Sequence, residues 1–287
     1  MSRPPRDEKP QKDGWLRPFL RRLAANSAEP EILFEGDSAL HHVTVVERDG
    51  RRTLFLGPNA REAETSVSLT DPEAAVFEYP GMMLLSLAVG PKNRRILMLG
   101  LGGGFIPGLF QKRLPEHALT VVEVDPLVAE LAENFFGFAP GGNVELVIAD
   151  GLEHIAALPD ESYDQIWLDA FDGAYIPPHL ATTAFLELAR TKLVEGGLLT
   201  QNLHQTAWRL YSDQLTDAKA VFGHEPLIFN GTRCGNSVAM SLNSVDDELP
   251  RTGAELAEAV KAFKTEVGPY NLLVEARKLA KKNELQF

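Results

Sequence analysis

From residue 95 onward, short apolar runs alternate with helical patterns, and this alternation constrains the fold more than any other feature. Such runs are typical of strands that are buried on both faces, and strands that alternate with helices form parallel sheets. The sequence therefore predicts an α/β fold with a doubly wound, mostly parallel sheet. The expected strands are Ile96–Gly100, Leu119–Val124, Val144–Ile148, Gln165–Asp169 and Leu198–Asn202, and the expected helices are Ile106–Leu114, Leu127–Phe136 and Thr183–Leu193, the last with Gly196-Gly197 as its C-cap.

The flanking segments predict four parts of the chain. Residues 1–30 form a tail and a short helix around Trp15–Leu23, which lies on a membrane surface or packs against its own domain or a partner. Residues 31–90 form a small β-hairpin domain and a linking helix, residues 91–245 the strand-and-helix domain, and residues 246–287 C-terminal helices. A closing hairpin is expected near residues 226–242.

Two turn signals lie in the predicted N-terminal domain. Asp49-Gly50 stands between two strand-like runs, a pattern typical of a β-hairpin. A helical pattern covers residues 72–89, and Pro80-Gly81 is expected to interrupt it.

Charge and cysteine content limit the partners and the compartment. Asp and Glu number 40 against 28 Lys and Arg, a net charge of −12, so a nucleic-acid partner is not expected. The single cysteine, Cys234, excludes a disulfide framework and favours a reducing cytoplasm. No apolar stretch approaches the roughly 20 residues of a membrane span, and the polar first residues resemble no secretory signal.

A glycine cluster follows the first predicted strand of the larger domain. Gly100, Gly102, Gly103 and Gly104 allow a tight turn and a close approach of the backbone to a ligand at a helix N-terminus. A plain strand–helix turn has the same pattern. A dinucleotide fingerprint would need glycine at the position of Phe105, which weakens an NAD-binding interpretation.

Acidic residues close three of the predicted strands. Glu123 lies 19 residues after Gly104, the spacing at which a carboxylate accepts hydrogen bonds from ribose hydroxyls. Asp150 and Asp169 end the next two strands. Because the carboxyl ends of parallel strands meet at one edge of the sheet, we expect the three carboxylates to share one crevice. Solvated strand ends or loop braces are the alternatives.

Together, Gly100–Gly104, Val122–Pro126, Ala149–Gly151, Asp169 with Asp172, and Gly196-Gly197 resemble the spermidine synthases. This resemblance implies the Rossmann-like fold of class I S-adenosylmethionine methyltransferases and makes residues 91–245 a nucleoside-binding catalytic domain. It further implies an amine acceptor, no metal, and a homodimer formed through the N-terminal β region.

The resemblance also assigns roles to individual residues. Glu123 would bind the ribose, the Asp150-Gly151 pair the adenine, and the glycine loop would lie along the nucleoside. Asp169 would be the general base near the attacking amine, and Asp172 would help to hold that amine. Tyr79 matches the family tyrosine that precedes the first sheet strand.

Departures from the family pattern concern the acceptor and the arm of the donor. Gly103 stands where spermidine synthases have an aspartate that pairs with the ammonium of decarboxylated S-adenosylmethionine. The full donor carries a carboxylate that such an aspartate would repel, so Gly103 favours S-adenosylmethionine, whereas Asp169 with Asp172 favours polyamine-like chemistry. His41 replaces a family glutamine, and Pro80-Gly81 replaces polar residues.

Three functions are compatible with these observations. The first is a transferase that moves a methyl or aminopropyl group from S-adenosylmethionine, or its decarboxylated form, to an amine, with Asp169 as general base. A sulfonium carbon is already electrophilic, and no metal-ligand spacing such as H-E-x-x-H is present, so no metal is expected. The alternatives are a non-catalytic nucleoside-binding scaffold and, disfavoured by Phe105, an NAD-dependent oxidoreductase.

Overall fold

A seven-stranded sheet forms the centre of the computed structural model, which describes residues 29–57, 63–71, 73, 76–91, 95–171, 176–205, 208–231, 235–246 and 248–282. The strand order is β10-β11-β9-β8-β5-β6-β7. The five strands from β9 to β7 run parallel, and β11 is antiparallel to both of its neighbours. The predicted doubly wound sheet is confirmed. Its strands are β5 (Arg95–Leu99), β6 (Ala118–Glu123), β7 (Val144–Ile148), β8 (Tyr163–Leu168), β9 (Leu193–His204), β10 (Leu227–Asn230) and β11 (Asn236–Asn243).

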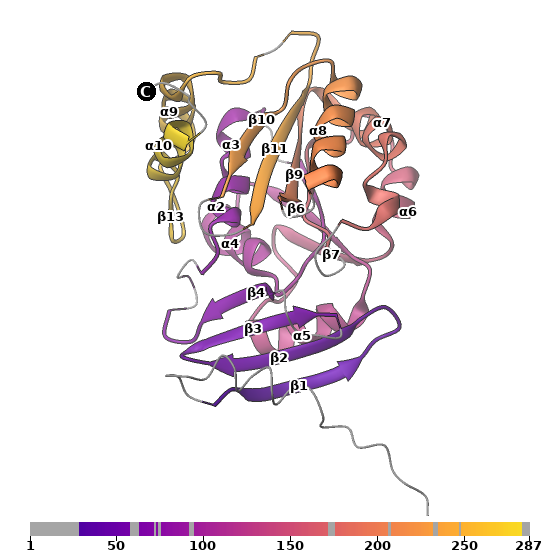
Figure 1. Ribbon diagram of the computed structural model, residues 1–287, viewed down its shortest axis with the longest axis vertical. Helices are drawn as coiled ribbons and strands as arrows, with labels where there is room; N and C mark the ends of the chain where they lie inside the picture. Colours follow the sequence, from indigo (N-terminus) through magenta and orange to yellow (C-terminus); the bar gives the residue numbers. More distant parts are fainter. Residues whose placement is uncertain are drawn as a thin grey trace, which may run out of the picture.

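Helices cover both faces of this sheet (Figure 1). Successive residues of a strand point to opposite faces, so Ile96 and Met98 join one core while Leu97 and Leu99 join another. On the first face lie α2 (Tyr79–Leu84), α3 (Ser86–Val89), α4 (Phe105–Arg113), α9 (Gly253–Phe263) and α10 (Leu272–Lys282), and on the second α6 (Gly151–Ala157), α7 (Thr183–Lys192) and α8 (Trp208–Phe222). In the described part of the chain, no helix has the length and apolar character of a bilayer span.

The N-terminal β region is an antiparallel sheet of four strands (Figure 1). Asp49 and Gly50 both have positive φ, 50° and 71°, as a tight hairpin turn requires, and the predicted hairpin is confirmed. One face of the sheet packs on α5, where Val45 and Leu54 share a core with Leu131. The strands are β1 (Glu31–Asp37), β2 (His42–Arg48), β3 (Arg51–Leu56) and β4 (Ala63–Ser68), and the helix is α5 (Pro126–Phe136).

Two expectations about glycine and proline are wrong. Gly196-Gly197 does not cap α7, because that helix ends at Lys192 and the chain passes directly into β9. Gly196 instead lies where the register between β8 and β9 shifts, and its φ of 74° fits an irregular strand. Pro80-Gly81 does not interrupt a helix, since α2 begins at Tyr79 and proline is tolerated in a first helical turn.

Several elements lie outside the predicted set. Strand β4 and helices α6 and α8 are not among the predicted elements. A short hairpin of β12 (Glu266–Val267) and β13 (Tyr270–Asn271) lies between the C-terminal helices α9 and α10. The closing hairpin is confirmed as β10 and β11. The helix around Trp15–Leu23 lies outside the described residues, and the four-part division of the chain stays a prediction.

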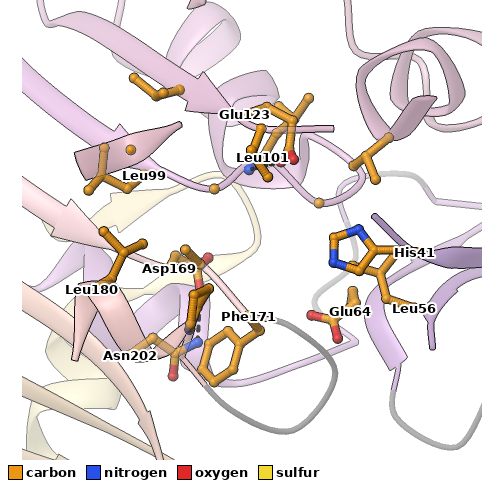
Figure 2. A pocket seen from close by; sticks show the side chains of 18 of the residues that line it. His41, Leu56, Glu64, Leu99, Leu101, Glu123, Asp169, Phe171, Leu180 and Asn202 are labelled. Carbon is orange, nitrogen blue, oxygen red and sulfur yellow. Dashed lines mark hydrogen bonds between the residues drawn. The ribbon is translucent and has the colours of Figure 1, made fainter. Parts of the chain in front are cut away.

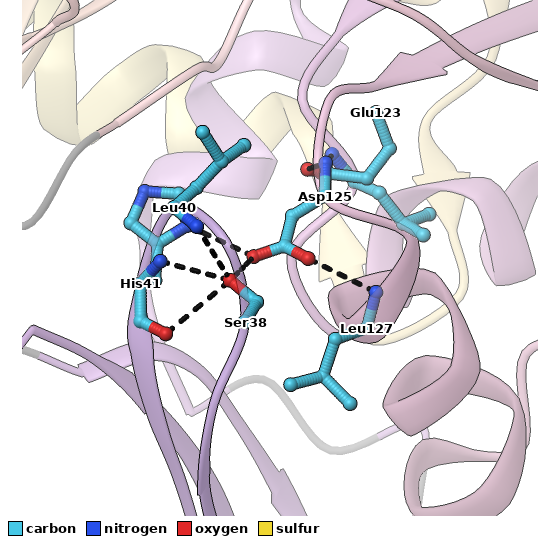
Figure 3. A network of polar contacts seen from close by, with 7 residues as sticks. Ser38, Leu40, His41, Glu123, Asp125 and Leu127 are labelled. Carbon is cyan, nitrogen blue, oxygen red and sulfur yellow. Dashed lines mark hydrogen bonds and ion pairs between the residues drawn. The ribbon is translucent and has the colours of Figure 1, made fainter.

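Asp125 joins the N-terminal sheet to the central domain (Figure 3). Its carboxylate is fully buried and caps α5 by accepting a hydrogen bond from the backbone N–H of Leu127 at 3.0 Å. The second oxygen accepts a hydrogen bond from the Ser38 hydroxyl and lies 3.1 Å from Nδ1 of His41. Both of these residues belong to the turn between β1 and β2, so one side chain fixes that turn against the start of α5.

Replacing Asp125 with Ala should lower the free energy of unfolding by about 2–3 kcal/mol, because the helix loses its cap and the buried contacts with Ser38 and His41. Ser38→Ala removes one of these contacts and also the hydrogen bonds that the Ser38 hydroxyl accepts from the backbone N–H groups of Leu40 and His41, but it keeps the cap of α5, so it should cost about 1–2 kcal/mol. Urea unfolding followed by circular dichroism measures both values. Equal losses in the two variants would contradict the double role of Asp125.

Candidate functional site

A cavity of about 460 Å³ opens at the carboxyl ends of the parallel strands (Figure 2). Its position follows the rule that ligands of such sheets bind beyond the strand ends, and its volume suits a nucleoside-sized ligand. Glu123, Asp150 and Asp169 all line it, so the predicted convergence of three strand-end carboxylates is confirmed. The N-terminal sheet and its first turn supply the opposite wall with Leu40, His41, Leu56, Ala63 and Glu64.

The glycine loop between β5 and α4 brings bare backbone to this cavity. Gly100 has a φ of 101°, and a Cβ atom there would lie 2.2 Å from the carbonyl oxygen of Asp169. Only glycine permits this approach between the ends of β5 and β8. Gly100 and Gly102 line the cavity. Gly103 and Gly104 belong to the same loop but face away from the cavity, where Gly103 packs against Thr65 and Gly104 against Phe138.

Glu123 holds two loops together at the end of β6. One carboxylate oxygen accepts a hydrogen bond from the backbone N–H of Leu101 at 3.0 Å, and the other accepts one from Asp125 at 2.9 Å. Burial raises the pKa of Glu123, and these two hydrogen bonds partly oppose that shift. A carboxylate has about four acceptor positions, so two remain for the vicinal hydroxyls of a ribose.

Asp150 has a structural duty as well as a place in the cavity. It is the N-cap of α6, and one oxygen accepts hydrogen bonds from the backbone N–H groups of Leu152 and Glu153. The other oxygen lies 3.1 Å from Nε2 of His179. Gly151 also lines the cavity. The cap fixes the orientation of the Asp150 carboxyl group and thereby the direction of its second oxygen. A contact of this oxygen with an adenine amino group stays a prediction.

Asp169 directly follows β8, is half-buried and lines the cavity. Desolvation by the neighbouring protein atoms raises the pKa of its carboxyl group to about 7. Asn202, at the end of the neighbouring β9, donates a 2.7 Å hydrogen bond to Asp169 and opposes part of the shift. Asn236 in turn donates to the amide oxygen of Asn202 at 3.0 Å, which orients the Asn202 amide.

Tyr79, at the start of α2, lines the cavity beside Phe77, as the sequence predicts for a site residue. Asp172, the aspartate predicted to hold the acceptor amine, and Tyr175 both lie outside the described residues. The role of Asp172 stays a prediction.

Sequence reasoning missed three polar residues of the site, Asn202, Asn236 and Glu64. Asn202 lies near the carboxyl end of β9, so the rule that located the three acidic residues was sufficient to find it. Glu64 lies on the unexpected strand β4 and gave no such signal. His179 and His204 also line the cavity.

The lining is rich in carboxylates. Among the described residues that line it, four are acidic, namely Glu64, Glu123, Asp150 and Asp169, and none is Lys or Arg. The described residues contain no group of three or more His, Cys, Asp or Glu that could hold a metal ion. The acidic lining favours a cationic ligand on electrostatic grounds.

Comparison with known proteins places the chain in a family. The spermine/spermidine synthase domain model matches residues 78–222. The polyamine aminopropyltransferase of Vibrio vulnificus (strain CMCP6) is 33% identical over 250 residues, which cover 85% of this chain and 83% of the relative. The chain belongs to the spermine/spermidine synthase family. It is a transferase of the S-adenosylmethionine type, as the sequence predicts, and family membership favours this function over an oxidoreductase.

Solved structures of two kinds resemble this family member. A spermidine synthase in complex with the transition-state analogue AdoDATO aligns with a TM-score of 0.67 and 21% identity, over 88% of both chains. Human methyltransferase-like protein 13 in complex with SAH aligns with a TM-score of 0.59 and 25% identity, over 70% of this chain and 93% of that one. The predicted methyltransferase-like fold is thereby confirmed.

The raised pKa of Asp169 has a consequence for stability. Between its ordinary value of 3.8 and its folded value of about 7, the folded chain binds a proton that the unfolded chain has released. The free energy of unfolding should therefore fall as the pH rises through this window, and Asp169→Asn should remove that part of the slope. Urea titrations at pH 5, 6, 7 and 8 measure it.

Asp213→Asn, which removes an exposed carboxylate on α8, is the matched control for the loss of one acidic group. A variant Asp169→Asn whose stability follows the wild-type pH dependence throughout would contradict the raised pKa.

Proposed function

We propose that this family member transfers the aminopropyl group of decarboxylated S-adenosylmethionine to an amine. The observation that carries the proposal is the acidic lining of the cavity, with four carboxylates and no Lys or Arg among the described lining residues. The decarboxylated donor carries a sulfonium and an ammonium, and the acceptor amine arrives as a cation. These positive charges match the lining, whereas the carboxylate of the full donor does not.

The nucleoside part of the donor fits the residues at the strand ends. Glu123 binds the two ribose hydroxyls with its remaining acceptor positions, and Asp150 accepts a hydrogen bond from the adenine amino group. Gly100 and Gly102 let the backbone lie close to the sulfur-bearing arm. This seating places the sulfonium between the glycine loop and Asp169.

Asp169 removes the proton from the attacking amine. An alkylamine is mostly protonated at neutral pH, so it needs a base before it attacks. Desolvation raises the pKa of Asp169 to about 7, and the positive charges of donor and acceptor lower it, which favours the ionised base. The amine nitrogen then bonds to the carbon next to sulfur, the carbon–sulfur bond breaks, and its electron pair leaves on the neutral thioether.

Methyl transfer from the full donor is the second candidate. Gly103 supports it, because the loop lacks a carboxylate that would repel the donor's own carboxylate. The likeness to methyltransferase-like protein 13, whose structure holds SAH, supports it as well. The acidic lining weighs against it. A homodimer, a cytoplasmic location and the absence of metal, nucleic-acid and membrane partners remain predictions of the sequence.

Incubation with each donor and a panel of diamines and polyamines, followed by mass spectrometry, decides between the two reactions. We expect aminopropylated amine and methylthioadenosine from the decarboxylated donor, and little product from S-adenosylmethionine. Methylated amine from the full donor would overturn the proposal in favour of methyl transfer, and no product with any acceptor would favour the scaffold alternative.

Asp169→Asn should lower kcat by about 10²–10⁴-fold because the amine loses its base. The donor Kd should rise by much less than kcat falls, because three other carboxylates of the described lining remain. In the wild-type enzyme, kcat/KM should rise with pH through the pKa of Asp169 and then level. Asn202→Ala should move this limb to higher pH, because it removes the hydrogen bond that lowers that pKa. Asp213→Asn is the control, and wild-type turnover in Asp169→Asn would refute the base role.

A further inference from the structure

The space beside Gly103 is filled by a neighbouring strand. A Cβ atom on Gly103 would lie 2.7 Å from Cγ2 of Thr65 and 3.1 Å from the ring of Phe136. Thr65 belongs to β4, is only 6% exposed, and accepts a 2.8 Å hydrogen bond from the backbone N–H of Gly103. A carboxylate side chain at position 103 therefore has no room without a shift of β4, so this loop position cannot supply a partner for an ammonium.

The residue before Thr65 points the other way, into the cavity. In the pairing of β3 with β4, Leu54 faces Thr65 and Phe55 faces Ala63, which leaves Glu64 as the extra residue of a β-bulge. A bulge re-aims the side chain of its extra residue. Glu64 lines the cavity, and Figure 2 shows its carboxylate on the wall that faces Asp169 and Phe171.

The other three acidic residues of the described lining lie at or just after the ends of the parallel strands. Glu123 holds the glycine loop and faces the ribose, and Asp150 caps α6 near the predicted adenine position. Asp169 is bound by Asn202 at the reaction centre. Glu64 is the fourth, and it comes from the N-terminal sheet rather than from the strand ends.

The geometry of the transfer reaction also favours β4 as the element beside the ammonium of the propylamine arm. In an in-line displacement the attacked carbon lies between the sulfur and the nucleophile, so the rest of the propylamine arm must turn away from that line. With the amine near Asp169 and the nucleoside along the strand ends, the arm turns toward the glycine loop and β4. An ammonium there needs an acceptor or a carboxylate to replace its hydration.

We propose that Glu64 binds the terminal ammonium of the aminopropyl arm and thereby selects decarboxylated over full S-adenosylmethionine. This assignment rests on the proposed function and adds a specificity-determining residue to it. Glu64 pairs with the ammonium and repels the carboxylate that only the full donor has. The bulge in β4 thus supplies the charge that the glycine loop lacks.

Calorimetric titration of the full chain with three ligands tests this assignment. Glu64→Gln should weaken binding of the decarboxylated donor about ten-fold or more, because a charge-assisted hydrogen bond is lost. Methylthioadenosine, which has the same nucleoside and no ammonium, should bind as tightly as before. The Kd of S-adenosylmethionine should change by less than about three-fold, since attraction and repulsion at its zwitterionic arm offset each other. Glu31→Gln, on an exposed position of β1, is the matched control.

The outcomes separate the two proposals. If the wild type transfers aminopropyl groups but Glu64→Gln binds the decarboxylated donor unchanged, Glu64 is not the ammonium partner and the reaction stands. If the variant loses affinity only for that donor while the wild type transfers none of it, the ammonium site stands and the reaction is wrong. Equal loss for methylthioadenosine refutes the assignment, because the defect then lies in the nucleoside pocket.

Discussion

The hydrogen bonds that Glu123 accepts from Leu101 and Asp125 are the interactions on which the site depends. They fix the glycine loop and the start of α5 on one buried carboxylate. Asp125 then carries the connection onward, since its own side chain holds Ser38 and His41 of the N-terminal sheet. Glu123 and Asp125, two acidic residues of one turn, thus join three segments that are distant in the sequence, and the cavity lies between these segments.

The described lining of the cavity contains carboxylates and no Lys or Arg. Burial raises the pKa of both Glu123 and Asp169, and no Lys or Arg of the described lining opposes this. Under the proposed function, a cationic donor and a cationic amine supply the positive charge, so their binding favours ionisation of these carboxylates. Ligand binding and activation of the proposed base are then coupled through electrostatics.

The sequence was sufficient for the central sheet and for most of the nucleoside side of the cavity. Buried parallel strands have a strong pattern, and their shared carboxyl edge brings Glu123, Asp150 and Asp169 together whatever the details of the loops. Gly196 was misassigned because a glycine after a helix marks a C-cap or an irregular strand equally well. Strand β4 was missed because Ala63–Ser68 is small and polar, and the aim of Glu64 depends on a bulge that only pairing with β3 creates.

The strand-end carboxylates could be predicted and Glu64 could not, because the two kinds of residue come from different sheets. Under the proposed function, the central sheet binds the nucleoside with groups at strand ends, whose places are set by topology. The N-terminal sheet approaches the glycine loop from outside, and Thr65 and Glu64 are consecutive residues with opposite directions, one packed on Gly103 and the other lining the cavity. Because side chains alternate along a strand, a shift of one residue in β4 would exchange their places. Under the proposed assignment of Glu64, donor choice is therefore set by the register of a small sheet, while the nucleoside pocket stays unchanged.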